Sequence, residues 1–81
     1  MESRSLQTTI FRIDPSRKMN RYYTLSVQPN LFGGHSLIRS WGRIGSGGQV
    51  KIDLHVDEVS ARGALERLLK SKRNRGYSTN R

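Results

Sequence analysis

A strict alternation of apolar and polar residues in one short segment constrains the fold more than any other feature of the chain. Residues 49–56 read QVKIDLHV, so that every second residue is a branched aliphatic. Side chains alternate between the two faces of a β-strand, and this segment therefore has one apolar face and one polar face. Such alternation is typical of a sheet that is buried on one side only, as an antiparallel meander is.

Three earlier segments have a similar character and complete the predicted sheet. We expect strands over residues 8–13, 21–27 and 36–44, in addition to 49–56. The turn signal Asp14-Pro15-Ser16 ends the first strand, and a loop with Pro29 and two glycines ends the second. The glycine-rich run 45–48, which begins with Gly45, predicts a tight hairpin between the last two strands.

The last third of the chain predicts one amphipathic helix. Its apolar residues recur at helical spacing and are Ala61, Ala64, Leu65, Leu68 and Leu69. Asp57 or Ser60 can cap the start, and Gly76 is placed to end the helix. The fold class is therefore α+β, a four-stranded antiparallel sheet with one C-terminal helix packed on one face. We expect a lead-in over residues 1–7, a single domain over 8–78 and a tail over 79–81.

The faces of the strand 36–44 bear on function. Alternation places Leu37, Arg39, Trp41 and Arg43 on one face. We expect the helix to cover the face of Val50, Ile52, Leu54 and Val56, which leaves the Trp41 face toward solvent, opposite the helix. Lys51 is expected on the same outward face. For Gly42 we expect a structural role, either a close approach of backbone or helix or a bulge.

The charge of the chain indicates a polyanionic partner. Fifteen Lys and Arg against six Asp and Glu give a net charge of +9 over 81 residues. Nucleic acid is the leading candidate, and an acidic membrane or an acidic protein surface is the alternative. An indole flanked by guanidinium groups suits nucleic acid, because aromatic rings stack on bases. The residues predicted to bind it are Trp41, Arg43, Arg39, Lys51, Lys70 and Arg73.

The composition argues against metal, cofactor and catalytic sites. The chain has no cysteine, and neither His35 nor His55 has a neighbour at a metal-binding spacing. The run 45–48 lacks the Lys-Ser/Thr pair and the following helix of a nucleotide-binding loop. No spacing indicates a nucleophile–base pair, and so small a core leaves little room for a water-excluding pocket. We therefore expect no metal, no cofactor and no enzymatic activity.

The sequence also bears on location. No stretch has the apolar length of a membrane span, and residues 1–5 lead into no signal-peptide core. We expect a cytoplasmic protein that does not engage a membrane, and one that is nucleoid-associated if the source is bacterial.

Four segments in order resemble the WGR domain, a family named for its Trp-Gly-Arg tripeptide. They are Asn20-Arg21-Tyr22-Tyr23, Trp41-Gly42-Arg43-Ile44-Gly45, the hairpin 45–48 and residues 65–77, which read LERLLKSKRNRGY. The likeness covers residues 9–78, and the ordered set is far more specific than the tripeptide alone. The family occurs in poly(ADP-ribose) polymerases and in short stand-alone bacterial proteins.

The resemblance implies a DNA-binding module. In the polymerases the family's tryptophan stacks on sugar or base near a strand break, and its arginine contacts DNA and neighbouring domains; the matching positions are Trp41 and Arg43. These 81 residues hold no catalytic, zinc-finger or helical regulatory domain, so ADP-ribosyl transfer is not carried over. We predict a non-catalytic module that binds DNA largely without sequence preference and favours ends or breaks. The alternatives are docking of an acidic protein partner and RNA binding.

Overall fold

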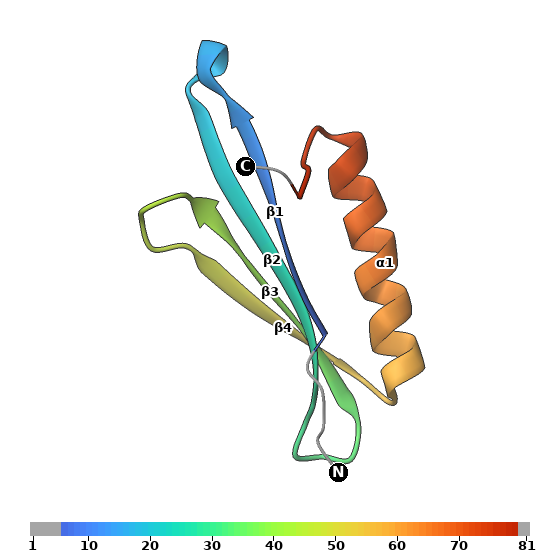
Figure 1. Cartoon of the computed structure of the whole chain (residues 1–81). Coiled ribbons are helices and arrows are strands. Elements are labelled where there is room, and N and C mark those ends of the chain that lie inside the picture. The colour runs from blue at the N-terminus through green and yellow to red at the C-terminus, as the bar shows by residue number, and fades with distance from the viewer. Residues whose placement is uncertain (1–5, 80–81) are drawn as a thin grey trace.

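The computed structural model describes residues 6–79, which form an antiparallel four-stranded meander and one long helix. In chain order, and side by side in the sheet, the strands are β1 (Leu6–Asp14), β2 (Met19–Pro29), β3 (His35–Arg43) and β4 (Gln49–His55). The helices are the short 3-10 helix η1 (Pro15–Arg17) and α1 (Glu58–Asn74), which lies on one face of the sheet (Figure 1). The predicted fold class is confirmed. The strand β1 begins at Leu6, earlier than predicted, and the rest of the predicted lead-in and most of the tail lie outside the described residues.

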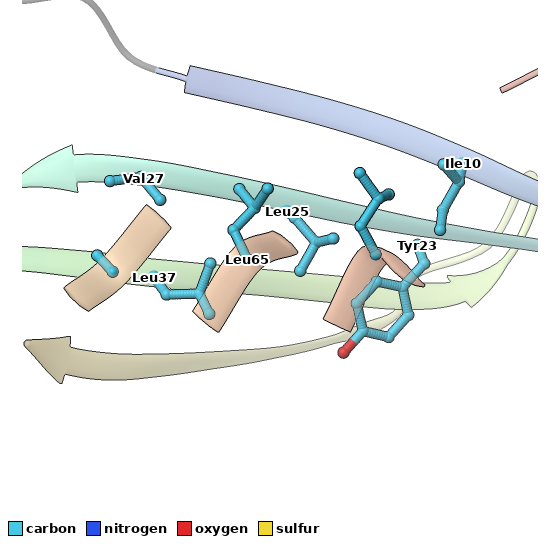
Figure 2. Packing of buried hydrophobic residues seen from close by; sticks show 8 residues of the cluster. Ile10, Tyr23, Leu25, Val27, Leu37 and Leu65 are labelled. Atoms are coloured by element: carbon cyan, nitrogen blue, oxygen red, sulfur yellow. The ribbon is translucent and has the colours of Figure 1, made fainter. Parts of the chain in front are cut away.

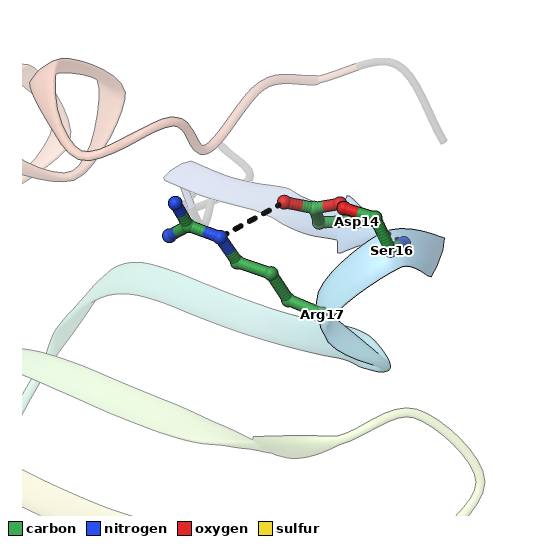
Figure 3. Close-up of polar contacts among 3 residues, drawn as sticks. All are labelled: Asp14, Ser16 and Arg17. Atoms are coloured by element: carbon green, nitrogen blue, oxygen red, sulfur yellow. Dashed lines mark hydrogen bonds and ion pairs between the residues drawn. The ribbon is translucent and has the colours of Figure 1, made fainter.

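The connection between β1 and β2 is a tight turn fixed by Asp14. The Asp14 carboxylate accepts hydrogen bonds from the Ser16 hydroxyl at 2.7 Å and the Ser16 backbone N–H at 3.2 Å (Figure 3). The Arg17 Nε atom lies 3.7 Å from the second carboxylate oxygen. The hydrogen bond from the Ser16 hydroxyl is the largest influence on this carboxyl and lowers the pKa of Asp14. The turn predicted from Asp14-Pro15-Ser16 is thus present.

Helix α1 starts and stops where the sequence predicted. The Asp57 carboxylate accepts a hydrogen bond from the Ser60 backbone N–H at 2.8 Å, so Asp57 is the N-cap. Gly76 follows the helix with a φ of 98°, a backbone conformation that glycine adopts without strain. The chain then returns to the sheet, where Ser78 bridges Phe11 of β1. The end of the helix is therefore tied to the edge of the sheet.

The core lies between α1 and the sheet, chiefly its two central strands (Figure 2). Its buried apolar residues are Ile10, Tyr23, Leu25, Val27, Leu37, Ala61, Leu65 and Leu69. The β2–β3 register places Val27 opposite Leu37 and Tyr23 opposite Trp41. On the helix, Ala61, Leu65 and Leu69 are four residues apart, about one helical turn, and form a buried stripe that packs on this face of the sheet.

The prediction that the Trp41 face lies opposite the helix is wrong. Trp41 is half-buried and packs against the core, on the same face as Leu37, which is only 1% exposed. The residues that the helix was expected to cover are exposed on the other side of the sheet. Their exposures are 64% for Val50, 58% for Ile52, 65% for Leu54 and 84% for Val56.

The correction has a physical reason in the strand register. Alternation divides each strand into two faces but does not say which face a helix covers. Helix α1 packs mainly on β2 and β3, where Leu25, Val27 and Leu37 offer the larger apolar surface. Leu37 is paired with Asp53, so the helix-facing side of β4 is its polar side. The face that β4 turns toward the helix is therefore determined by its pairing with β3 and not by its own apolar residues.

Replacing Leu65 by alanine is expected to lower the free energy of unfolding by about 2–5 kcal/mol, because it opens a cavity between helix and sheet. Leu65 is 1% exposed, whereas Leu31 is 100% exposed and serves as the matched control. The substitution Leu31→Ala is expected to change stability by less than about 0.5 kcal/mol. Urea unfolding followed by circular dichroism measures both, and equal costs would contradict this placement of the core.

Candidate nucleic-acid interface

A hollow of about 610 Å³ lies between the last turn of α1 and the strands β2 and β3. It is lined by Arg21, Tyr22, Tyr23, Arg39, Trp41, Gly42, Arg43, Lys72 and Tyr77. This lining combines aromatic rings with cationic side chains and contains no carboxylate. An anion that carries a flat ring is the ligand that such a lining suits best.

The indole of Trp41 is held in place from beneath by Tyr23. The two residues are directly opposite on β3 and β2, and their rings stack with centroids 5.7 Å apart and planes 14° apart. Tyr23 is 4% exposed, so its ring is a fixed part of the core. The guanidinium carbon of Arg39 lies 5.9 Å from the centroid of the indole ring. Trp41 therefore faces the hollow with an orientation that is set before any ligand arrives.

Three arginines form a row across the sheet beside Trp41. The register pairs Arg12 of β1 with Arg21 of β2, and Arg21 with Arg43 of β3. Like charges directly opposite each other destabilise a sheet. Within residues 6–79, none of the three is joined to a carboxylate in an ion pair. A phosphate backbone would relieve this repulsion by placing anions between the guanidinium groups.

Lys72 brings a further cation to the hollow from the helix. Its ammonium nitrogen lies 4.4 Å from the ring centroid of Tyr23 and 5.6 Å from that of Tyr77. Desolvation by burial lowers the pKa of Lys72, and repulsion from Arg75 and Arg39 lowers it further. The ammonium group is thus held against aromatic rings among like charges. An anion in the hollow would stabilise its charged form.

Arg39 differs from the three arginines of the row because it has a carboxylate partner. Its Nε atom lies 2.9 Å from an Asp53 carboxylate oxygen, and its terminal nitrogen donates to the Tyr23 hydroxyl at 3.5 Å. Burial acts to lower the pKa of Arg39, but the contacts with Tyr23 and Asp53 outweigh it, so the pKa is raised. Arg39 is therefore a permanent cation at the floor of the hollow. Its charge is partly neutralised, unlike that of Arg43.

The structure brings together three of the six residues predicted to bind nucleic acid, namely Trp41, Arg43 and Arg39. Lys51 is exposed on β4, opposite Arg39 but outside the hollow. The remaining two, Lys70 and Arg73, line a separate hollow of about 470 Å³ on α1 that also includes the acid Glu66. A role in binding for these last three residues stays a prediction.

The predicted site did not include five residues that line the hollow, namely Arg21, Tyr22, Tyr23, Lys72 and Tyr77, or Arg12, which completes the arginine row outside it. A signal for two of them was available. Arg21 and Tyr23 are two apart on one strand, so alternation places both on one face. Their position beside Trp41 depends on the β2–β3 register, which no local pattern gives.

The two glycines singled out in the sequence shape the hairpin next to Trp41. A β-carbon at Gly42 would lie 2.9 Å from the Cα atom of Gly48, so a larger residue would push the hairpin backbone away. Gly48 itself lies against the Trp41 carbonyl and the Tyr22 hydroxyl, with no room for a side chain. Gly45 has a φ of 89°, which favours glycine. The hairpin can therefore fold closely onto the strand that carries Trp41.

The model of the WGR domain family matches residues 6–81. The chain belongs to the WGR domain family. WGR domains are a family of nucleic-acid-binding modules. In this WGR domain the name-giving tripeptide is Trp41-Gly42-Arg43, the end of β3, and it forms part of the hollow.

One curated relative extends the comparison. The uncharacterized protein y4dW of Sinorhizobium fredii is 46% identical to this WGR domain over 77 residues. The match covers 95% of this chain and 38% of that protein, so the chain spans well under half the length of its relative. No solved structure matches the chain.

Residues 6–79 lack two further features. No helix among them has both the length and the apolar character needed to cross a bilayer. The same residues contain no group of three or more His, Asp or Glu side chains arranged to hold a metal ion.

Replacing Tyr23 by leucine is expected to shift the emission of Trp41 to longer wavelength and to increase its quenching by acrylamide. The substitution keeps an apolar side chain in the core but removes the ring on which the indole stacks. Trp41 is the only tryptophan, so the emission reports on this site alone. The control is Phe32→Leu, at an aromatic residue that is 86% exposed and lies outside the hollow. Equal responses of the two variants would show that the stacking does not orient Trp41.

Proposed function

We propose that this WGR domain is a non-catalytic module that binds DNA largely without sequence preference and favours ends or breaks. One observation carries the proposal. Arg21 and Arg43 lie directly opposite each other beside Trp41, with no acidic residue in the hollow that they line. Two facing guanidinium groups next to an aromatic ring match a phosphate next to a base or sugar.

The proposed roles follow from the contacts. Arg21 and Arg43 bind phosphate oxygens, and Lys72 adds a third positive charge from the helix. Trp41 stacks on a base or sugar with the part of its ring that Tyr23 leaves uncovered. Arg39 supports this group from the floor of the hollow, because Asp53 and Tyr23 already hold it.

A preference for ends has a physical basis in this arrangement. In an intact duplex the faces of the bases are stacked on one another and closed to an indole. At an end or a nick one base face is open, and stacking on it contributes about 1–3 kcal/mol. Contacts to phosphate position a protein but carry no sequence information, which accounts for the proposed lack of sequence preference.

The three predicted contacts outside the hollow have a weaker role in this proposal. Lys51, Lys70 and Arg73 are exposed and are not part of the lining around Trp41. They attract the phosphate backbone from a distance, within a Debye length of about 8–10 Å. This attraction supports the encounter but does not select ends.

Removing Arg21 and Arg43 together is expected to weaken DNA binding more than removing two other cations. Each phosphate contact contributes about 0.9 to the slope of log K against log salt concentration, so the double alanine variant loses about 1.8 from the slope. The matched control, Lys70→Ala with Arg73→Ala, removes the same charge outside the hollow and is expected to change the slope by much less. Fluorescence anisotropy at several salt concentrations measures both. An equal effect of the two pairs would leave only general charge attraction.

Replacing Trp41 by alanine is expected to abolish the preference for ends while retaining salt-dependent binding to intact DNA. The reason is that only the stacking step distinguishes an open base face from a closed one. Blunt, nicked and covalently closed duplexes of one sequence, titrated with wild type and variant, provide the test. Matched RNA competitors are added in the same assay. Equal binding of the wild-type domain to all duplexes, or tighter binding to RNA, would contradict the proposal.

A further inference from the structure

In the part of the chain that the structure describes, the outer edge of β4 is unpaired along its full length. The strand β4 is the last of the sheet and pairs only with β3. The opposite edge strand, β1, differs because Ser78 bridges to Phe11 there. Among residues 6–79, no segment pairs with the outer side of β4. An open edge is a template for pairing with another strand.

The backbone groups on this open edge can be assigned from neighbouring contacts. The Ile44 N–H donates to the Asn20 carbonyl at 2.8 Å and the Asn30 N–H donates to the Gly34 carbonyl at 3.0 Å, so even-numbered positions along β3 turn their backbone groups to β2. The odd-numbered residues of β3 therefore turn theirs to β4, where they are paired with odd-numbered residues. In an antiparallel pair, alternate residues turn both backbone groups to the same neighbour. The odd-numbered residues of β4 therefore bond to β3. The even-numbered residues, Val50, Ile52 and Leu54, present their N–H and C=O groups to the open edge.

The charges of β4 are self-complementary about Ile52. In an antiparallel pairing of two copies centred on this residue, Lys51 of each copy lies opposite Asp53 of the other. Val50 lies opposite Leu54, and Ile52 lies opposite Ile52. The nearest other registers in which side chains on the same face remain opposite each other are centred on residue 51 or 53. They place Lys51 against Lys51 or Asp53 against Asp53. Like charges directly opposite each other are unfavourable, so the charges select one register.

The remaining surface around β4 also favours a second copy. Each chain has a net charge of +9, and two such chains repel each other wherever their basic surfaces meet. The strand β4 carries one lysine and one aspartate and so has no net charge, although Asp53 is also held by Arg39 of its own chain. The uncovered face of the sheet carries no charged strand residue from Thr9 to Leu54. Pairing through β4 therefore does not bring one strand of net positive charge against another.

We propose that two copies of this chain pair antiparallel through β4, centred on Ile52, and join their sheets into one. The exposed side chains of Val50, Ile52 and Leu54 then contact their counterparts across the two-fold axis. Because this axis is perpendicular to the sheet, both helices lie on one side, and both Trp41 hollows open on that side. The proposal is independent of what the hollow binds.

Sedimentation equilibrium of the full chain, freed of nucleic acid by nuclease and high salt, tests this pairing. The wild-type protein is expected to show a mass that rises with concentration from one chain to two. Lys51→Glu places acids opposite each other and is expected to leave a monomer; Lys51 is exposed and makes no described ion pair, so the fold is retained. The matched control is Lys70→Glu, an equal charge change on the helix, which is expected to dimerise as the wild type does.

A mixing experiment separates pairing from folding defects. Asp53→Lys alone is expected to be monomeric, and circular dichroism checks its fold because the contact with Arg39 is lost. Mixed with the Lys51→Glu variant, it is expected to form a heterodimer, because each acid then lies opposite a lysine. A wild-type protein that stays monomeric up to about 1 mM, the weak end of specific association, would overturn the proposal. A dimer that Lys51→Glu leaves unchanged would overturn it as well.

Discussion

The stacking of Trp41 on Tyr23 is the contact on which the rest of the structure depends. It exists because the β2–β3 register places the two residues opposite each other, on the face that α1 covers. The same register places Arg21 opposite Arg43, two residue pairs further along the ladder and on the same face. A slip of one residue would turn every side chain of a strand to the other face. Core packing and the geometry of the hollow are therefore fixed by one and the same pairing.

The distribution of charge across the sheet follows from this arrangement. All charged residues of the central strands and β4 lie on the face that α1 occupies, and the opposite face is neutral. The helix covers the apolar part of that face, so the cations gather where apolar cover ends, around Trp41. A small domain with a net charge of +9 can thus hold a compact core and still concentrate guanidinium groups at one place. The opposite face and the β4 strand carry no net charge and remain available for contacts with uncharged surfaces.

The elements of this fold are largely readable from local signals. Alternation gave the strands, Asp57 and Gly76 marked the helix ends, and glycines marked the hairpin. The side of the sheet on which the helix packs was not readable. The cleanest alternation lies on β4, an edge strand whose apolar residues stay exposed. The helix packs on the face that carries Leu25, Val27 and Leu37 of the central strands. A pattern within one strand carries no information about its neighbours.

The candidate site divides in the same way. Trp41, Arg39 and Arg43 belong to one strand, so alternation alone grouped them. Arg21 joins them only through the register, and Lys72 only through the rotation of α1 about its axis. That rotation also separates Lys72 from Lys70, although both belong to one run of basic residues. A high density of basic residues in a sequence indicates that the partner is negatively charged. It does not indicate which surface of the fold binds that partner.

The position of Lys72 over the Tyr23 ring has a consequence for the dynamics of the domain. This contact joins the final helical turn to the sheet, and helix ends are the places where local opening costs least. A ligand held jointly by Lys72 and by the strand arginines would bind only the closed arrangement, and so would suppress that opening. Occupancy of the hollow would then be visible as slower amide exchange in the last turn of α1, the turn that carries Lys72.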